Sequence, residues 1–207
     1  MIKKVCILTS RDVGKKCVEW ATSNTPADFL LTNDIDSADI IISVMYENII
    51  KKKQMQNKVC FNFHPGTLPE YRGSGVFSWV IINQERKMGI TLHLMDEGMD
   101  TGDIIEIRQF LVSRQDTAHS LFLRGEQVIL KMFKDWYADL LSGNYTACPQ
   151  DPKEGKNYYI KDLQRAKNLT KFVKAFHFPE KEPAYFYNDK MEKTYIHYTK
   201  ELQSEKY

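Results

Sequence analysis

The most informative part of the chain reads Val59-Cys60-Phe61-Asn62-Phe63-His64-Pro65-Gly66. An apolar run that ends in Pro-Gly predicts a buried strand that stops at residue 65. Strand side chains repeat every two residues, so Asn62 and His64 point to the same face, roughly 6 to 7 Å apart along the strand. In open α/β sheets, ligands bind at the carboxyl ends of the strands. We therefore expect the amide and the imidazole to lie at a ligand site.

Other strands and helices alternate around this run. Apolar or alternating patterns predict strands over residues 4–9, 28–32, 39–44, 89–95 and 103–111. The β-branched segment 40–44 has the strongest pattern of a parallel strand covered on both faces. Helical spacing predicts a helix over 12–23 with Asp12 as the N-cap and a long amphipathic helix over 116–141. Between them we expect a helical turn over 48–54 and a short helix over 76–85. This order indicates an α/β fold built on a parallel sheet.

The composition is that of an ordinary globular protein. Of the 207 residues 43% are hydrophobic and 27% charged, so one domain with an appendage, or two small domains, can bury a core. A net charge of +2 gives no argument for binding nucleic acid or a membrane. The four cysteines lack metal-type spacing, and the first apolar run is too short for a signal peptide or a membrane span. We expect a soluble cytoplasmic protein without a bound metal.

The composition changes after Pro149, and we place a domain boundary near residue 150. Residues 151–207 are rich in Lys and Tyr, with one or two short helices predicted over 161–176 and a β-hairpin over 184–198. The edges of that hairpin are exposed and aromatic. We expect another surface to cover it, with a second copy of the chain, in a homodimer, as the candidate.

Several motifs continue from the first strand. In order they are Asn62-x-His64-Pro65-Gly66-x-Leu68-Pro69-x-Tyr71-Arg72-Gly73, Trp79, Gly89-Ile90-Thr91-x-His93 and Asp96-Glu97-Gly98-x-Asp100-x-Gly102. This set resembles the catalytic domain of the N10-formyltetrahydrofolate-dependent formyltransferases, densely over 59–110 and weakly over 1–58. The resemblance implies a formyltransferase domain over 1–150 with a Rossmann-like parallel-sheet core. The core is expected to be trimmed, because the segment before Asn62 is shorter than the family usually has by roughly a strand and a helix.

Within this family the chain looks most like the sugar-nucleotide N-formyltransferases. Methionyl-tRNA formyltransferases carry a larger basic carboxyl-terminal domain, whereas residues 151–207 hold twelve Lys and Arg against nine Asp and Glu, too small a surplus to grip a phosphate backbone. Glycinamide ribonucleotide enzymes have a glycine-rich loop after the first strand, and residues 9–14 lack that pattern. The segment 176–186 is similar to its counterpart in the sugar-nucleotide enzymes. The implied partners are a nucleotide-linked amino sugar and folate, with neither nucleic acid nor a membrane.

Formyl transfer to an amine suits three side chains of these motifs. Asn62 would stabilise the tetrahedral oxyanion, where one amide donor can be worth about 3 kcal/mol. His64 would transfer protons, because its reference pKa of about 6.5 allows both forms. Asp100 would orient His64 and favour its charged form, or take the amine proton through a water. Asp96 and Glu97 compete with Asp100 for this role, and the motif spacing favours Asp100.

Two further groups of residues are expected to bind the substrates. The resemblance implies that the N10-formyltetrahydrofolate co-substrate places its pterin between the loop after residue 44 and the 96–102 loop, near Met45, Tyr46, Ile49, Asp96 and Gly98. The nucleotide sugar would be held by aromatic stacking and pyrophosphate binding at Tyr71, Arg72 and Trp79. Ordinary core packing at Met45 and Ile49, and an Arg72 that pins its own turn, stay open as alternatives. His93 is expected to be a core or supporting histidine.

The sequence thus predicts an enzyme that formylates the amine of a nucleotide-linked amino-dideoxysugar. A dTDP-linked 3- or 4-amino-dideoxyhexose is the first expectation, for surface polysaccharide such as O-antigen. Three alternatives stay open. The acceptor can be another amine, such as glycinamide ribonucleotide or an amino acid derivative. The enzyme can instead hydrolyse formyltetrahydrofolate, or the chain can be a non-catalytic module that senses folate or nucleotides.

Overall fold

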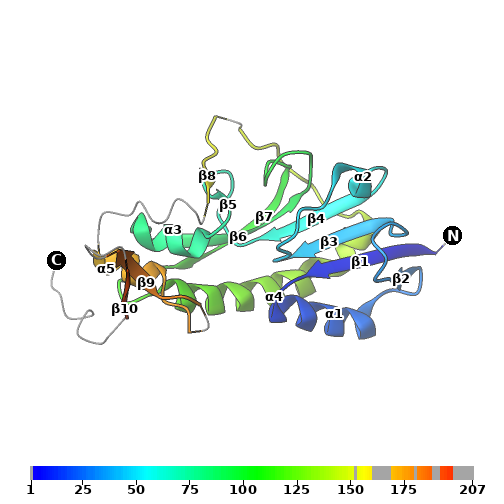
Figure 1. The fold of residues 1–207 in the computed structure, drawn as a ribbon. Helices are drawn as coiled ribbons and strands as arrows, with labels where there is room; N and C mark the ends of the chain where they lie inside the picture. The colour runs from blue at the N-terminus through cyan, green and yellow to red at the C-terminus, as the bar shows by residue number, and fades with distance from the viewer. Residues whose placement is uncertain (1, 152, 160–168, 180, 188–191, 198–207) are drawn as a thin grey trace.

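A six-stranded sheet with strand order β2-β1-β3-β4-β6-β7 forms the centre of the molecule (Figure 1). The computed structural model describes residues 2–151, 153–159, 169–179, 181–187 and 192–197. The sheet strands are β1 (Lys3–Thr9), β2 (Phe29–Leu31), β3 (Ile40–Val44), β4 (Val59–His64), β6 (Lys87–Leu94) and β7 (Ile104–Leu111). The first four pair in parallel, and β6 and β7 join antiparallel. The predicted α/β fold is confirmed, with the parallel part limited to four strands.

Five helices accompany the sheet in the described part of the chain. They are α1 (Asp12–Asn24), α2 (Lys52–Met55), α3 (Val76–Ile82), α4 (Ala118–Ser142) and α5 (Leu169–Ala175). None of them combines the length and the apolar character that a membrane crossing requires. Asp12 is not the N-cap of α1, so that prediction was wrong. Arg11 holds the cap position without a side-chain hydrogen bond, and the Asp12 carboxylate accepts a hydrogen bond from Lys15 at 2.8 Å instead.

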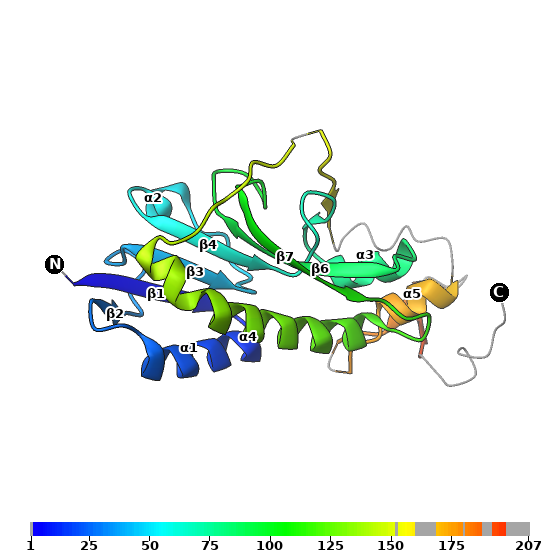
Figure 2. The ribbon, with the colours of Figure 1, turned by 180° about the vertical axis from the view of Figure 1, so that it is seen from behind.

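Helices α1 and α4 pack on one face of the sheet (Figure 2). The alternation of β4 sends Phe61 and Phe63 into this core, where neither is exposed. Phe63 meets Phe133 of α4 with ring centroids 5.7 Å apart. Burying a side chain of this size stabilises the fold by about 1.5–3 kcal/mol. This packing fixes β4, and with it the opposite face of the strand.

Local signals set the two ends of α4. At its start, Thr117 and Ser120 form a capping box, in which each side chain accepts a hydrogen bond from the other's backbone N–H. At its end, Gly143 adopts the left-handed backbone with φ 79°. The predicted amphipathic helix is therefore confirmed with capped ends.

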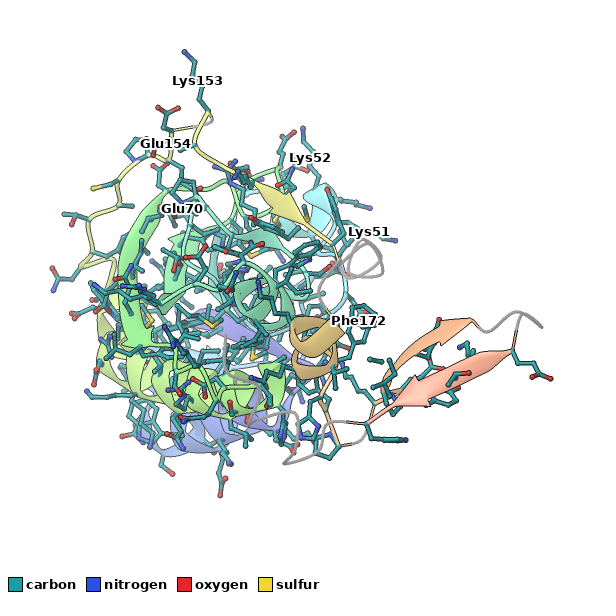
Figure 3. The ribbon with its side chains drawn as sticks, turned by 90° about the vertical axis from the view of Figure 1, so that its left-hand side faces the viewer. Lys51, Lys52, Glu70, Lys153, Glu154 and Phe172 are labelled. Atoms are coloured by element: carbon teal, nitrogen blue, oxygen red, sulfur yellow. The ribbon has the colours of Figure 1, made fainter. Side chains whose placement is uncertain are left out.

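The chain after residue 150 returns to the main body. Strand β8 (Asn157–Tyr158) pairs in parallel with β5 (Arg72–Gly73), and α5 packs against α3 through a 2.7 Å hydrogen bond from Ser78 Oγ to the carbonyl of Ala175. Strands β9 (Ala184–Tyr187) and β10 (Lys193–Ile196) pair antiparallel and extend away from the body (Figure 3). The turn predicted between them and the first part of the predicted 161–176 helix lie outside the described residues. The homodimer stays a prediction.

Candidate active site

The candidate site lies at the carboxyl end of β4, beside the loop that joins β6 to β7. Asn62 and His64 share the face of β4 that points away from the phenylalanine core. The antiparallel register places His93 of β6 opposite Asn62 and Thr91 opposite His64. The strand alternation thus delivers the amide and the imidazole to one place, as predicted.

The third predicted residue arrives from the 96–102 loop. Asn62 Nδ2 lies 3.3 Å from Asp100 Oδ1, within hydrogen-bond distance. His64 Nδ1 lies 3.5 Å from Asp100 Oδ2. The structure therefore brings together all three side chains that were predicted to act on the formyl group.

Asp100 is held in an uncommon backbone conformation. Its φ is 55°, in the left-handed region that non-glycine residues rarely adopt. The backbone N–H of Gly73 donates to Asp100 Oδ2 at 2.8 Å. The carboxylate is thus fixed from β5 on one side and from the Asn62 amide on the other.

Buried charge interactions govern the ionisation of this pair. Burial raises the pKa of Asp100, but the nearby His64 and His93 rings and the backbone hydrogen bond from Gly73 outweigh it, so the pKa lies well below its usual range. Burial lowers the pKa of His64, and the Asp100 carboxylate opposes only part of that shift. Near neutral pH the site therefore holds an ionised Asp100 beside a neutral His64.

The hydrogen bonds of His64 define its tautomer. Its Nε2 lies 2.7 Å from the carbonyl oxygen of Tyr71. A carbonyl can only accept, so Nε2 carries the hydrogen and Nδ1 of the neutral ring has a free lone pair beside Asp100. Gly66 makes this geometry possible, because a Cβ at this position would lie 2.6 Å from both His64 Nε2 and the Tyr71 oxygen.

His93 supports Asn62, as expected from its strand position. Its Nδ1 donates to the carbonyl of Leu94 at 2.6 Å, which leaves Nε2 as an acceptor. The second hydrogen of Asn62 Nδ2 points to His93 Nε2 at 3.1 Å. His93 therefore fixes the orientation of the Asn62 amide.

The 96–102 loop is shaped by Asp96. Its Oδ1 accepts hydrogen bonds from the backbone N–H of Gly98 at 3.0 Å and from Thr101 Oγ1 at 2.6 Å. A side chain at Gly98 would clash with Thr101, because its Cβ would lie 2.0 Å from Oγ1. Glu97 forms an ion pair with Lys52 of α2. This pair joins the 96–102 loop to the segment that follows β3.

The residues after β3 differ in how they pack. Met45 has φ 50° and contacts two apolar clusters, and Tyr46 packs against a third cluster on the opposite face of the sheet. Ile49 is 90% exposed, so the alternative of core packing is wrong for this residue. An exposed isoleucine beside the site is available to a ligand.

Tyr71, Arg72 and Trp79 all contact the segment after residue 150. Tyr71 stacks on Tyr158 at 4.8 Å and donates to Glu85 at 2.7 Å. The indole of Trp79 donates to the carbonyl of residue 159 at 3.2 Å. Arg72 is 6% exposed, and its guanidinium donates to the side chain of Gln150 rather than to the carbonyls of its own turn. A role for these residues toward the nucleotide sugar stays a prediction.

The polar contacts of two residues at the site, Thr91 and Gln150, were not anticipated from the sequence. Thr91 Oγ1 donates to the carbonyl of Gly66 at 2.6 Å and accepts from the N–H of Leu68 at 3.2 Å, which fixes the turn after His64. Gln150 is the partner of Arg72 and also donates to the 96–102 loop. The position of Thr91 opposite His64 would follow from the register of β6, which the sequence pattern does not give.

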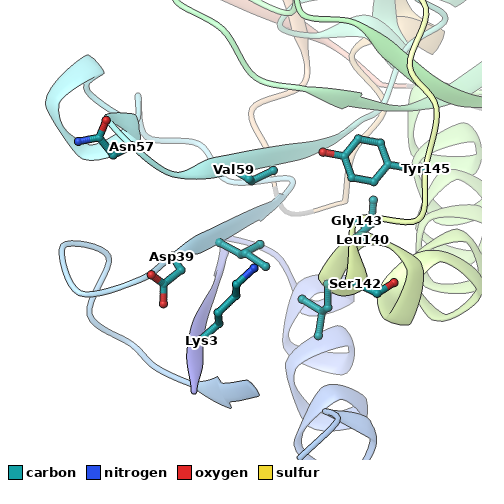
Figure 4. A pocket seen from close by; sticks show the side chains of 10 residues that line it. Lys3, Asp39, Asn57, Val59, Leu140, Ser142, Gly143 and Tyr145 are labelled. Atoms are coloured by element: carbon teal, nitrogen blue, oxygen red, sulfur yellow. The ribbon is translucent and has the colours of Figure 1, made fainter. Parts of the chain in front are cut away.

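A separate cavity of about 280 Å³ lies at the other end of the strands (Figure 4). Its lining includes Lys3, Asp39 and Val59 near the amino ends of β1, β3 and β4, and Tyr145 after α4. Ligands of such sheets bind at the carboxyl ends, so this cavity is not the candidate site. Among the described residues, no group of His, Cys, Asp and Glu side chains is arranged to hold a metal ion.

Comparison with known proteins agrees with this geometry. Residues 20–134 match the formyl transferase family. The chain belongs to this family, and the protein is a formyltransferase. It is 31% identical over 207 residues to the GDP-perosamine N-formyltransferase of Brucella melitensis, in a match that covers 88% of this chain and 78% of the relative.

Solved structures share the formyltransferase fold. A sugar N-formyltransferase from a Shewanella species superposes with a TM-score of 0.84 at 20% identity, over 96% of this chain and 98% of that one. The N-formyltransferase from Helicobacter canadensis, in complex with folinic acid and dTDP-3-aminofucose, gives a TM-score of 0.73 at 21% identity, over 87% of this chain and 82% of that one. At these identities the similarity concerns the fold, and the Rossmann-like core is confirmed.

Proposed function

We propose that this formyltransferase moves the formyl group of N10-formyltetrahydrofolate to the amine of a nucleotide-linked amino-dideoxysugar. The observation that carries the proposal is the meeting of Asn62, His64 and Asp100 at the carboxyl end of β4. In the reaction the amine nitrogen attacks the formyl carbon, the bond from that carbon to N10 breaks, and one amine proton is passed on to N10. The three side chains match these needs.

His64 accepts the amine proton. In its neutral form Nδ1 carries a lone pair, and this atom lies 3.5 Å from the ionised Asp100. When Nδ1 takes up the proton, the imidazolium faces a carboxylate that stabilises it. Because burial alone disfavours a charged His64, the stabilisation by Asp100 arises only as the proton is transferred. The same Nδ1–H then supplies the proton that N10 needs on leaving.

Asn62 stabilises the negative charge that develops on the formyl oxygen. Both hydrogens of its Nδ2 are engaged in the structure, one by His93 at 3.1 Å and one by Asp100 at 3.3 Å. When substrate binds, Asn62 gives up the longer hydrogen bond, to Asp100, and donates to the formyl oxygen instead. The hydrogen bond to His93 keeps the amide oriented. A donor of this kind is worth about 3 kcal/mol of transition-state stabilisation.

We assign the folate co-substrate to the region between the two loops beside the triad. The Lys52–Glu97 ion pair joins these loops, and the exposed Ile49 offers an apolar surface on the β3 side. Asp96 and Gly98 give the opposite loop its shape. Met45 and Tyr46 lie in the loop after β3, pack against apolar clusters of the body, and are the residues we assign to the pterin on this side. The folinic acid bound in the Helicobacter canadensis complex is in keeping with a folate donor.

For the acceptor, the first candidate is a dTDP-linked 3- or 4-amino-dideoxyhexose that serves surface polysaccharide such as O-antigen. The dTDP-3-aminofucose in the Helicobacter canadensis complex supports it. A GDP-linked amino sugar is the second candidate, because the Brucella melitensis relative is a GDP-perosamine N-formyltransferase. Both candidates present an amine to the same triad, and they differ in the nucleotide and in the sugar that it carries.

An acceptor panel tests this proposal. The enzyme is incubated with N10-formyltetrahydrofolate and dTDP-, GDP- or UDP-linked 3- and 4-amino-dideoxyhexoses, with glycinamide ribonucleotide and amino acids in parallel. We expect a formylated sugar nucleotide, detected by mass spectrometry, with one tetrahydrofolate released per product. Formylation of a non-sugar amine alone would reject the acceptor class. Formate release that no amine changes would indicate a hydrolase.

Variants of the triad test the mechanism. Asn62→Ala and His64→Asn should abolish turnover and leave folate binding, followed by fluorescence titration, largely intact. Asn144→Ala and His197→Asn are matched controls, because both residues are exposed in the structure and neither belongs to the site. Full turnover in either triad variant would refute the assigned roles.

A further inference from the structure

Gln150 links the two segments that hold Asp100. We propose that Gln150 is a positioning residue for Asp100, an inference that rests on the function proposed for that carboxylate. Gln150 lies 50 residues after the aspartate with which it interacts. Its single amide group contacts both the 96–102 loop and the side chain of Arg72.

The donor side of the amide holds the loop. Gln150 Nε2 donates to the carbonyl of Asp100 at 3.0 Å and to the carbonyl of Gly102 at 2.7 Å. The backbone of Asp100 is left-handed, with φ 55°, a conformation that persists only where the surroundings impose it. These two hydrogen bonds fix the backbone at Asp100 and at Gly102, two residues later.

The acceptor side holds the strand that carries the second contact to Asp100. Gln150 Oε1 accepts from Arg72 Nε at 3.2 Å and from Arg72 Nη2 at 2.7 Å. Arg72 directly precedes Gly73, whose N–H donates to Asp100 Oδ2 at 2.8 Å. No carboxylate pairs with the Arg72 guanidinium in the described ranges of the chain. Gln150 thus fixes the aspartate through its backbone and, by way of Arg72, through the N–H that binds its carboxylate.

A primary amide is the group that this position requires. It must donate two hydrogen bonds to carbonyls and accept two from a guanidinium, and only Asn and Gln side chains offer both functions. Gln150→Glu keeps the acceptor and strengthens the pairing with Arg72, but it places a carboxylate against two carbonyl oxygens. Gln150→Met keeps the length and loses every hydrogen bond. Gln150→Glu therefore tests the loss of the donor function alone, and Gln150→Met tests the loss of both functions.

The test measures kcat and KM for both substrates in Gln150→Glu and Gln150→Met. Misplacement of a reacting group by about 1 Å costs about 100-fold in rate, so we expect kcat to fall about 10- to 100-fold in both variants. Both KM values should change less than about threefold, because the positioning acts on the transition state. Gln127→Glu, on the exposed side of α4, is the matched control and should keep wild-type kcat. Thermal unfolding by circular dichroism checks that each variant is folded.

A double-mutant cycle separates positioning from a general structural effect. If Gln150 acts through the carboxylate, Gln150→Met should reduce the residual rate of Asp100→Asn by less than about twofold, because residues that act as a unit are not additive. A full additional loss on the Asp100→Asn background, or wild-type kcat in folded Gln150→Glu, would overturn the inference. Wild-type activity of Asp100→Asn itself would instead overturn the proposed function, so the two failures are distinguishable.

Discussion

Gly66 lies directly against the hydrogen bond that sets the tautomer of His64. A Cβ built at this position would lie 2.6 Å from His64 Nε2 and 2.6 Å from the carbonyl oxygen of Tyr71. The substitution Gly66→Ala therefore inserts a methyl group between a donor and its acceptor. Because the Tyr71 oxygen belongs to the backbone, the imidazole is the partner that can move more easily. We predict that Gly66→Ala displaces His64 from Asp100.

The size of the effect follows from these distances. Ordinary van der Waals contact begins at 3.4 Å, so the imidazole must move by about 0.8 Å, the difference from 2.6 Å. A misplacement of about 1 Å at a reacting group lowers the rate about 100-fold, or about 2.7 kcal/mol in activation free energy. The lost hydrogen bond lowers the free energy of unfolding by only about 0.5–1.5 kcal/mol. Activity should fall far more than stability.

The assay follows tetrahydrofolate release with the acceptor that the panel identifies, together with urea denaturation of each variant. Gly143→Ala is the matched control. Gly143 ends α4 with φ 79° and has nothing within 4 Å of a built Cβ, so alanine there costs about 1 kcal/mol of stability through backbone strain alone. We expect similar stability losses in the two variants and a loss of kcat only in Gly66→Ala. A kcat within about twofold of wild type in Gly66→Ala would refute the reasoning.

Two further predictions concern the charge of the site and the core. Burial lowers the pKa of His64 and the Asp100 carboxylate raises it, so Asp100→Asn should move the NMR titration of His64 to lower pH; an unchanged or higher midpoint would contradict the pairing. Tyr137 is fully buried and its hydroxyl bonds Thr25 Oγ1 at 2.8 Å, so Tyr137→Phe should lower the free energy of unfolding by about 1 kcal/mol with kcat unchanged. A stability equal to wild type in urea denaturation would show that this hydrogen bond contributes nothing.

Much of the sheet was predictable because its strands carry strong local patterns. The alternation of β4 placed Asn62 and His64 on one face, and the structure confirms that arrangement. Strand direction was less accessible, since an alternating pattern is the same whether a strand runs parallel or antiparallel. The antiparallel pairing of β6 and β7 is set instead by contacts between strands. Cap geometry was also difficult, because a first-turn acid such as Asp12 resembles a capping residue in the sequence.

At the candidate site, too, the sequence pattern predicted local geometry better than contacts between distant segments. Asp100 was identified from its motif, and its approach to His64 depends on a left-handed backbone that the spacing Asp-x-Gly only suggests. The role of Gln150 could not be predicted from the sequence, because its partner Arg72 lies 78 residues earlier. Short-range patterns report the period of one strand or helix, and they carry no information on contacts between distant segments. The tertiary fold supplied those contacts.

The most direct test of the proposed reaction is its stoichiometry with the wild-type enzyme. N10-formyltetrahydrofolate is mixed with a nucleotide-linked amino-dideoxysugar, and formylated sugar, tetrahydrofolate and formate are measured over time. We expect equal amounts of formylated sugar and tetrahydrofolate with no excess formate, and no product when His64 is replaced by Asn. Formate in place of the formylated sugar, with every sugar nucleotide of the panel, would contradict the proposed transfer.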